Sequence, residues 1–172
     1  VRYSCHGLSL HALLHEKRER PDLPRLITMA VQIGQCMSYL HGKSILSKDL
    51  RSRNILVQQK GKVVISDFGL FSMGRLQAAQ AKTSDGSRVP PGLSRAALRV
   101  PDHWLCYQSP EVLRSLSLPE RLPSPEAVCP ELPFSKASDM FAFGTVWFEM
   151  LCGEFPWKGV PAESVVWQVC SG

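Results

Sequence analysis

The apolar positions near the start of the chain follow the repeat of a helix. Between residues 26 and 40 they are three or four positions apart, which places them on one face of an amphipathic helix. This stripe consists of Leu26, Ala30, Ile33, Met37 and Leu40. We expect the helix to end near His41 and Gly42. A shorter helical pattern covers Leu8 to His15.

A different pattern follows this helix. Residues 55–57 and 62–65 are short apolar runs rich in β-branched side chains, which is typical of strands. The residues between them end in Gly61, which suits the turn of a β-hairpin. The chain that enters the first strand and the chain that leaves the second strand are therefore expected at the same end of the hairpin.

The second half of the chain predicts two more helices. Residues 140–151 are apolar nearly all round, which predicts a helix buried in the centre of the protein. Ser138 and Asp139 suit its N-cap, and Gly153 suits its C-terminal end. A last helix is expected over residues 162–170.

Two segments, 74–101 and 118–133, show no helical or strand periodicity. The first is rich in Ala, Gln, Ser, Arg, Gly and Pro, and the second contains five prolines. Such composition is typical of loops, so we expect both segments to be insertions between regular elements.

Composition limits the class of protein. A chain of 172 residues with 44% hydrophobic residues is long enough for one domain, or a large part of one, with a buried core. The longest apolar stretch, 140–152, contains Glu149 and is shorter than the ~20 residues of a membrane span, so no span is expected. The six cysteines are widely separated, without a C-x-x-C pair, which excludes zinc ribbons and favours reduced thiols in the cytoplasm.

The positive charge is concentrated in one segment. The chain has a formal charge of +5, and segment 43–62 alone holds six basic residues against Asp49. A solvated loop, a nucleic-acid surface and a site that faces phosphate groups are the alternatives. No aromatic residue lies among the basic ones, which argues against a partner nucleic acid.

Three short motifs occur in order around the predicted hairpin. Residues 47–54 read Ser-Lys-Asp-Leu-Arg-Ser-Arg-Asn, residues 67–69 read Asp-Phe-Gly, and residues 109–111 read Ser-Pro-Glu. Each motif is weak alone, but the ordered set with the apolar helix beyond it is specific. The chain therefore resembles the C-terminal lobe of a protein kinase. This resemblance implies an α+β, protein-kinase-like fold: a mostly helical lobe with a short β-hairpin.

The resemblance also implies a domain organisation. We expect residues 1–172 to be a partial protein kinase domain, with the hinge and the C-lobe but without the N-lobe and the last C-terminal helices, because the glycine-rich loop and the strand lysine of kinases would precede Val1. Segment 74–101 then becomes an insertion in the activation segment, and 118–133 a proline-rich insertion.

Four polar residues acquire roles from the resemblance. Asp49 would accept the proton of an attacking substrate hydroxyl, and Arg51 would lie near the transferred phosphate. Asn54 and Asp67 offer oxygen ligands for Mg²⁺ that bridges the phosphates of ATP. The alternative for each residue is a structural role in a loop, cap or turn.

Two residues depart from the kinase pattern. Ser47 replaces the usual histidine, and we expect the smaller side chain to leave a gap beside Phe68. Lys48 replaces the usual arginine and lacks its bidentate grip on a phosphorylated activation segment. Both departures favour weak or no phosphoryl transfer.

Within the kinases, the chain resembles the kinase suppressor of Ras family of the tyrosine-kinase-like group. The matching segments are 48–50, 63–71, 104–107, 132–137, 141–147 and 166–169. This resemblance implies an ATP-binding scaffold in RAF–MEK–ERK signalling, with MEK and RAF as partners and with the RAF contact in the N-lobe. MEK would dock on the activation segment and on the last predicted helix, where Trp167 is the candidate anchor unless it packs on its own core.

Another function class remains open. An active serine/threonine protein kinase, which transfers the ATP γ-phosphate to protein hydroxyls, is favoured by the presence of Asp49, Asn54 and Asp67. A truncated chain that folds poorly and has no activity of its own is a third alternative.

Overall fold

The helical stripe near the start of the chain forms the longest helix of the described structure. The computed structural model describes residues 7–58, 61–68, 103–117 and 132–171. Helix α1 spans Leu23–Gly42, and Asp22 caps it by accepting a hydrogen bond from the Arg25 N–H at 3.3 Å. Its buried residues are Leu26, Met29, Ile33, Met37 and Leu40. The predicted amphipathic helix and its end at residue 42 are confirmed.

The predicted hairpin belongs to a three-stranded antiparallel sheet. Strands β2 (Ile55–Gln58) and β3 (Val63–Ile65) pair with Ile55 opposite Ile65, so the hairpin is confirmed. Strand β1 (Gly7–Ser9) pairs with the other edge of β2, in the order β1-β2-β3. The prediction of a helix from Leu8 was wrong at its start. Residues 7–9 form a strand instead, because their pairing satisfies backbone groups at the edge of β2 that would otherwise stay unpaired.

A short π-helix follows the first strand. This helix, η1, spans Ala12–Glu16 and buries Ala12, Leu13 and Leu14. The hydroxyl of Ser9 accepts a hydrogen bond from the backbone N–H of Ala12 at 3.1 Å, which helps the chain to turn from strand into helix. The predicted helical pattern thus applies to the second part of the segment.

Helix α4 begins two residues before the predicted N-cap at Ser138. It spans Lys136–Cys152, and Ser135 is its N-cap in a capping box with Ser138. The predicted cap at Ser138 and Asp139 was therefore wrong. Both residues lie within the first turn of the helix, and the Ser138 N–H donates to the Ser135 hydroxyl. Gly153 ends the helix as predicted, with a φ of 66°.

Helix α4 is buried on one face only. The buried face includes Ala142, Val146 and Met150, which belong to the main core with residues of α1 and the sheet. Four large apolar side chains on the helix remain exposed: Met140, Phe141, Phe148 and Leu151. The expectation of a helix buried all round is corrected in this respect for the described residues.

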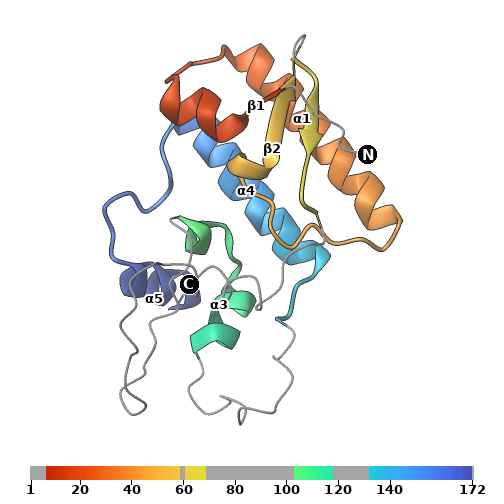
Figure 1. The fold of residues 1–172 in the computed structure, drawn as a ribbon. Helices are drawn as coiled ribbons and strands as arrows, with labels where there is room; N and C mark the ends of the chain where they lie inside the picture. The colour runs from red at the N-terminus through yellow and green to blue at the C-terminus, as the bar shows by residue number, and fades with distance from the viewer. Residues whose placement is uncertain (1–6, 59–60, 69–102, 118–131, 172) are drawn as a thin grey trace, which may run out of the picture.

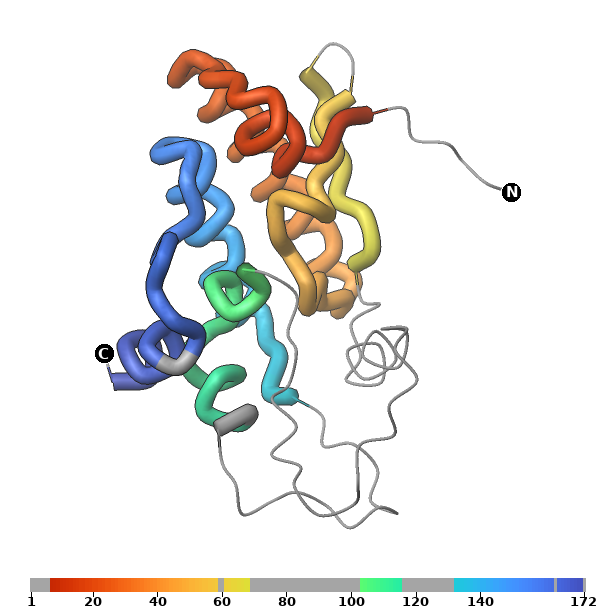
Figure 2. Tube along the Cα trace, turned by 60° about the vertical axis from the view of Figure 1, so that its left-hand side comes forward, coloured from red at the N-terminus to blue at the C-terminus, as the bar shows by residue number. Residues whose placement is uncertain are grey.

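The remaining helices lie at the end of the molecule opposite η1. Helix α3 (Pro110–Ser117) and helix α5 (Ala162–Ser171) pack against one another, and the short 3₁₀ helix η4 (Trp104–Tyr107) contacts both α5 and α4 (Figures 1 and 2). A guanidinium N–H of Arg114 donates to the Cys170 carbonyl at 2.6 Å and links α3 to α5. The helix expected over residues 162–170 is confirmed.

The described structure is mostly helical with one small sheet, as the sequence predicted. The four cysteines within it are free thiols: Cys36, Cys106, Cys152 and Cys170. No helix among the described residues has the length and hydropathy needed to cross a membrane. The predicted insertion 74–101 and nearly all of 118–133, as well as residues 1–6 of the expected hinge, lie outside the described residues.

Candidate functional site

The hairpin brings Asn54 and Asp67 together. Asn54 ends the short turn η2 (Ser52–Asn54) that leads into β2, and Asp67 follows β3 by two positions. The backbone N–H of Ser66 donates to the Asn54 carbonyl at 2.8 Å, and the Ser66 hydroxyl donates to Oδ2 of Asp67 at 3.1 Å. The loops before and after the hairpin therefore meet at one end, as predicted from the sequence.

Asp49 lies against Asn54 and Arg51. The side-chain amide of Asn54 donates to Oδ2 of Asp49 at 3.0 Å and to the Asp49 carbonyl at 2.8 Å. The Arg51 guanidinium lies 3.2 Å from the same Oδ2. Because the side-chain amide nitrogen of Asn54 is directed at Asp49, the side-chain oxygen of Asn54 is directed away from Asp49. Arg51, which the kinase resemblance implies to lie near a transferred phosphate, forms an ion pair with Asp49.

The Asp49 carboxyl is largely removed from solvent. Its side chain is 16% exposed, and burial raises its pKa above the usual value. The positive charge of Arg51 and hydrogen bonds with Asn54 and Trp104 oppose this shift, whereas the nearby charge of Asp67 adds to it. Asp49 therefore holds a proton more readily than a free aspartate.

Asp139 of α4 holds the loop that carries Asp49. Its carboxylate accepts hydrogen bonds from the backbone N–H groups of Ser47 at 2.8 Å and of Lys48 at 2.9 Å. His41, at the end of α1, contacts the same carboxylate through Nε2 at 2.8 Å. These contacts fix the loop in spite of the left-handed φ of 62° at Lys48.

This role of Asp139 could not be predicted from the sequence. The only signal was an acidic residue at the start of a strongly apolar helix, which suits a cap as well as a buried contact. A carboxylate that is 2% exposed requires partners, and here they come from α1 and the 47–48 loop.

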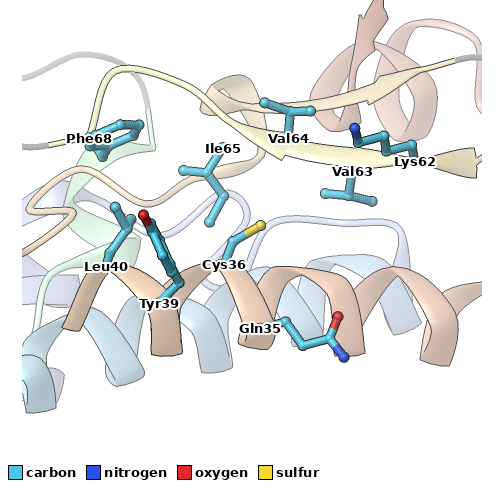
Figure 3. Close-up of a pocket in the computed structure, with 9 residues that line it drawn as sticks. All are labelled: Gln35, Cys36, Tyr39, Leu40, Lys62, Val63, Val64, Ile65 and Phe68. Carbon is cyan, nitrogen blue, oxygen red and sulfur yellow. The ribbon is translucent and has the colours of Figure 1, made fainter. Parts of the chain in front are cut away.

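A cavity of about 420 Å³ lies between α1 and β3 and borders Phe68. None of Asp49, Arg51, Asn54 and Asp67 lines it. Figure 3 shows Tyr39 and Leu40 directed towards it from α1, and Ile65 from β3. The residues that line it are Gln35, Cys36, Tyr39, Leu40, Lys62, Val63, Val64, Ile65 and Phe68. Ser47, whose small side chain was expected to leave a gap beside Phe68, does not line this cavity. The Phe68 side chain is 42% exposed.

Trp167 belongs to a different region from the four polar residues. It lies on α5, whose neighbours are α3 and η4, and its side chain is 70% exposed. The structure thus brings Asp49, Arg51, Asn54 and Asp67 to one site. It places Trp167 on an outer helix.

Comparison with known proteins gives the family of the chain. Residues 1–172 match the family described as "Protein tyrosine and serine/threonine kinase". The chain belongs to the protein kinase family. The loop that carries Asp49, the hairpin, and Asp67 and Phe68 of the Asp-Phe-Gly motif are thus parts of a kinase domain.

Three relatives illustrate the similarity of this kinase-family chain. It is 39% identical to "Kinase suppressor of Ras 2" from Homo sapiens, over 98% of the chain and 16% of that protein. It is 42% identical to "Kinase suppressor of Ras A" from Caenorhabditis elegans, over 95% of the chain and 19% of that protein. It is 31% identical to "Serine/threonine-protein kinase A-Raf" from Mus musculus, over 98% of the chain and 23% of that protein. The chain therefore spans less than a quarter of the length of these relatives.

Proposed function

We propose that the chain is a kinase-suppressor-of-Ras-type domain, an ATP-binding scaffold in RAF–MEK–ERK signalling with weak or no phosphoryl transfer. The single observation that carries this proposal is the exposure of Trp167 on α5, the helix on which the family resemblance places MEK. Large aromatic side chains dominate the energy of protein interfaces, and Trp167 has the largest exposed fraction among the exposed large apolar residues of the described chain.

The geometry of α5 supports an anchor at Trp167. Val165 is 4% exposed on the inner side of the helix, so one face of α5 packs on the lobe while Trp167 projects away from it. The carbonyl of Cys170 is also held by Arg114 of α3. An aromatic side chain on a helix that is already fixed loses little backbone freedom when a partner covers it.

The four polar residues would serve nucleotide binding. Asn54 and Asp67 contribute one amide oxygen and one carboxylate at the same end of the hairpin, which fits Mg²⁺ because this ion usually keeps water and phosphate oxygens as its other ligands. Bound Mg²⁺ would neutralise the charge of the ATP phosphates. In this proposal Asp49 is the acceptor for a substrate proton, and Arg51 holds Asp49 by their ion pair.

The surroundings of Asp49 support weak or no transfer. Oδ2 of Asp49 is already contacted by Asn54 and Arg51, and the buried Trp104 lies on the same carboxyl. A substrate hydroxyl has to come within about 3 Å of a general base for proton transfer. Oδ1 of Asp49 is itself buried, which restricts the approach of such a hydroxyl in this structure.

The alternative function is an active serine/threonine protein kinase. It is favoured by the short Asn54–Asp49 contact, which orients the carboxylate, and by the raised pKa of Asp49, which improves a base that works near neutral pH. Mg²⁺-dependent transfer of phosphate to MEK distinguishes this alternative from the scaffold.

Binding of MEK tests the proposed scaffold. Titration of purified MEK into the chain, with heat or fluorescence anisotropy as the signal, should show at least tenfold weaker binding for Trp167→Ala than for the wild type. Trp157→Ala is the matched control, because Trp157 is also exposed but precedes α5. Equal affinities for the wild type and Trp167→Ala would remove Trp167 from the interface.

In this proposal the protein acts in the cytoplasm, with RAF as a second partner. The free thiols of the described residues are compatible with that compartment.

A further inference from the structure

Trp104, the first residue of η4, has the largest fully buried side chain of the described residues. It is 1% exposed. Its neighbours Cys106 and Tyr107 belong to the main core of the described chain, whereas Trp104 does not. Packing in the main core therefore does not account for the burial of this indole, and other surroundings enclose it.

The geometry of η4 directs Trp104 towards the loop of the candidate site. A 3₁₀ helix has three residues per turn, so Trp104 and Tyr107 lie on the same face of η4. The Tyr107 hydroxyl contacts the Ser52 hydroxyl at 3.3 Å, which places this face against the turn that follows Arg51. The side-chain amide of Gln108 donates to the Trp104 carbonyl at 3.3 Å and fixes the start of η4.

The side chain that Trp104 meets in this loop is Asp49. Burial raises the pKa of Asp49, and a hydrogen bond with the Trp104 side chain is one of the interactions that oppose this shift. An indole can only donate, so Trp104 is the donor and the carboxyl is the acceptor. Asn54 and Arg51 already contact Oδ2 of this carboxyl at 3.0 and 3.2 Å, and its Oδ1 is buried. Three side chains thus enclose the carboxyl.

The indole N–H resembles a substrate hydroxyl in one respect only. Both groups bring a hydrogen-bond donor to a carboxylate, and a hydroxyl has to come within about 3 Å of it for proton transfer. The indole nitrogen has no acceptor lone pair, so it offers no nucleophile for phosphoryl transfer. An indole on Asp49 therefore uses the place of a substrate without being one.

We propose that Trp104 covers the carboxyl of Asp49 in the position of a substrate hydroxyl and thereby keeps protein hydroxyls away from it. This inference rests on the proposed function, in which Asp49 is the acceptor for a substrate proton and transfer is weak or absent. The motifs at residues 47–54, 67–69 and 109–111 do not include Trp104. Its contact with Asp49 joins segments that are more than fifty positions apart.

Chemical labelling of carboxyl groups in the full chain tests this cover. The reagents are a water-soluble carbodiimide and glycine ethyl ester, and mass spectrometry of the peptides gives the rate at each site. In the wild type, Asp49 should react about tenfold more slowly than Glu154, whose side chain is 54% exposed. In Trp104→Ser, Asp49 should react about tenfold faster than in the wild type, because the ring that covers it is removed.

Asp139 is the internal control for folding in this experiment. It is 2% exposed, so it should remain unreactive in the wild type and in Trp104→Ser as long as the lobe is folded. Wild-type reactivity of Asp49 in a folded Trp104→Ser variant would overturn the proposal.

A second measurement leaves Trp104 in place and decides the case if Trp104→Ser does not fold. Asp49→Ala removes the acceptor, so the indole N–H of Trp104 should exchange with solvent about tenfold faster than in the wild type, as followed by nuclear magnetic resonance. The indole N–H groups of Trp147, Trp157 and Trp167 serve as controls and should exchange as before. An unchanged exchange rate for Trp104 would also overturn the proposal.

Neither measurement depends on MEK or on phosphate transfer. A chain that does not bind MEK, or that phosphorylates it, would contradict the proposed function. The labelling of Asp49 and the exchange of the Trp104 indole would then still decide whether Trp104 covers Asp49.

Discussion

The carboxylate of Asp139 accepts a hydrogen bond from the backbone N–H of Ser47 at 2.8 Å, across 92 positions of the chain. This contact attaches the loop of the candidate site to α4. Because Asp139 also holds the N–H of Lys48 and contacts His41, its removal leaves buried polar groups without a partner. We expect Asp139→Ala to lower the free energy of unfolding by about 3 kcal/mol.

Chemical denaturation followed by tryptophan fluorescence measures this effect. Glu154→Ala is the control, because it removes a carboxylate in an exposed ion pair with Lys158 and should change stability much less than Asp139→Ala does. Similar losses in the two variants would show that the Asp139 contacts do not hold the loop.

Two glycines should respond to alanine in opposite directions. Gly153 has a φ of 66°, and a Cβ there would collide with the guanidinium of Arg20, so Gly153→Ala should destabilise the protein by at least about 1 kcal/mol. Gly34 lies within α1, and a Cβ there would meet nothing within 4 Å, so Gly34→Ala should stabilise it by about 0.5–1 kcal/mol. Thermal unfolding of both variants beside the wild type gives the two signs, and a stabilised Gly153→Ala would contradict the C-cap.

Burial of His11 makes the stability of the protein depend on pH. Burial lowers the pKa of His11 most, and the charges of Arg53 and His15 lower it further. The folded state thus favours the neutral ring, so the contribution of His11 is complete above its unfolded pKa of about 6.5 and is lost as the pH falls towards its lower folded pKa.

We therefore expect the free energy of unfolding to fall less steeply between pH 7.5 and 5.5 in His11→Gln than in the wild type. Glu16→Gln should have the opposite effect, because the Glu16 carboxylate opposes the shift from 3.7 Å away. Denaturant titrations at a series of pH values provide the slopes. Parallel pH profiles for wild type and His11→Gln would contradict a perturbed His11.

The N-cap of α4 gives a further prediction. The Ser135 hydroxyl accepts a hydrogen bond from the Ser138 N–H at 3.1 Å, so Ser135→Ala should cost about 1 kcal/mol of unfolding free energy. Ser38→Ala, an exposed site within α1, serves as the control and should have little effect. A loss in Ser135→Ala no larger than in the control would show that the capping box is not important for stability.

Local periodicity was sufficient for some elements of the fold. The stripe of α1 and the hairpin β2–β3 were predicted because their signals repeat within a few neighbouring residues. Strand β1 could not be predicted in this way, because its three residues are stabilised by pairing with β2, about fifty positions further along the chain.

The candidate site was predicted in part for the same reason. The spacing of Asp49 and Asn54 lies within one loop, and the structure shows their side chains in contact. The support from Asp139 and the contact of Trp104 with Asp49 depend on distant segments, which no local pattern reports. Burial of Asp139 and Trp104 was visible only in the structure.

We propose that the chain binds MEK without transferring phosphate to it. The most direct test is to incubate purified chain with MEK, ATP and Mg²⁺, and to measure phosphate incorporation into MEK for the wild type and for Asp49→Asn. We predict the same background incorporation for both proteins while both bind MEK. Mg²⁺-dependent incorporation by the wild type that Asp49→Asn abolishes would contradict the account and establish an active kinase.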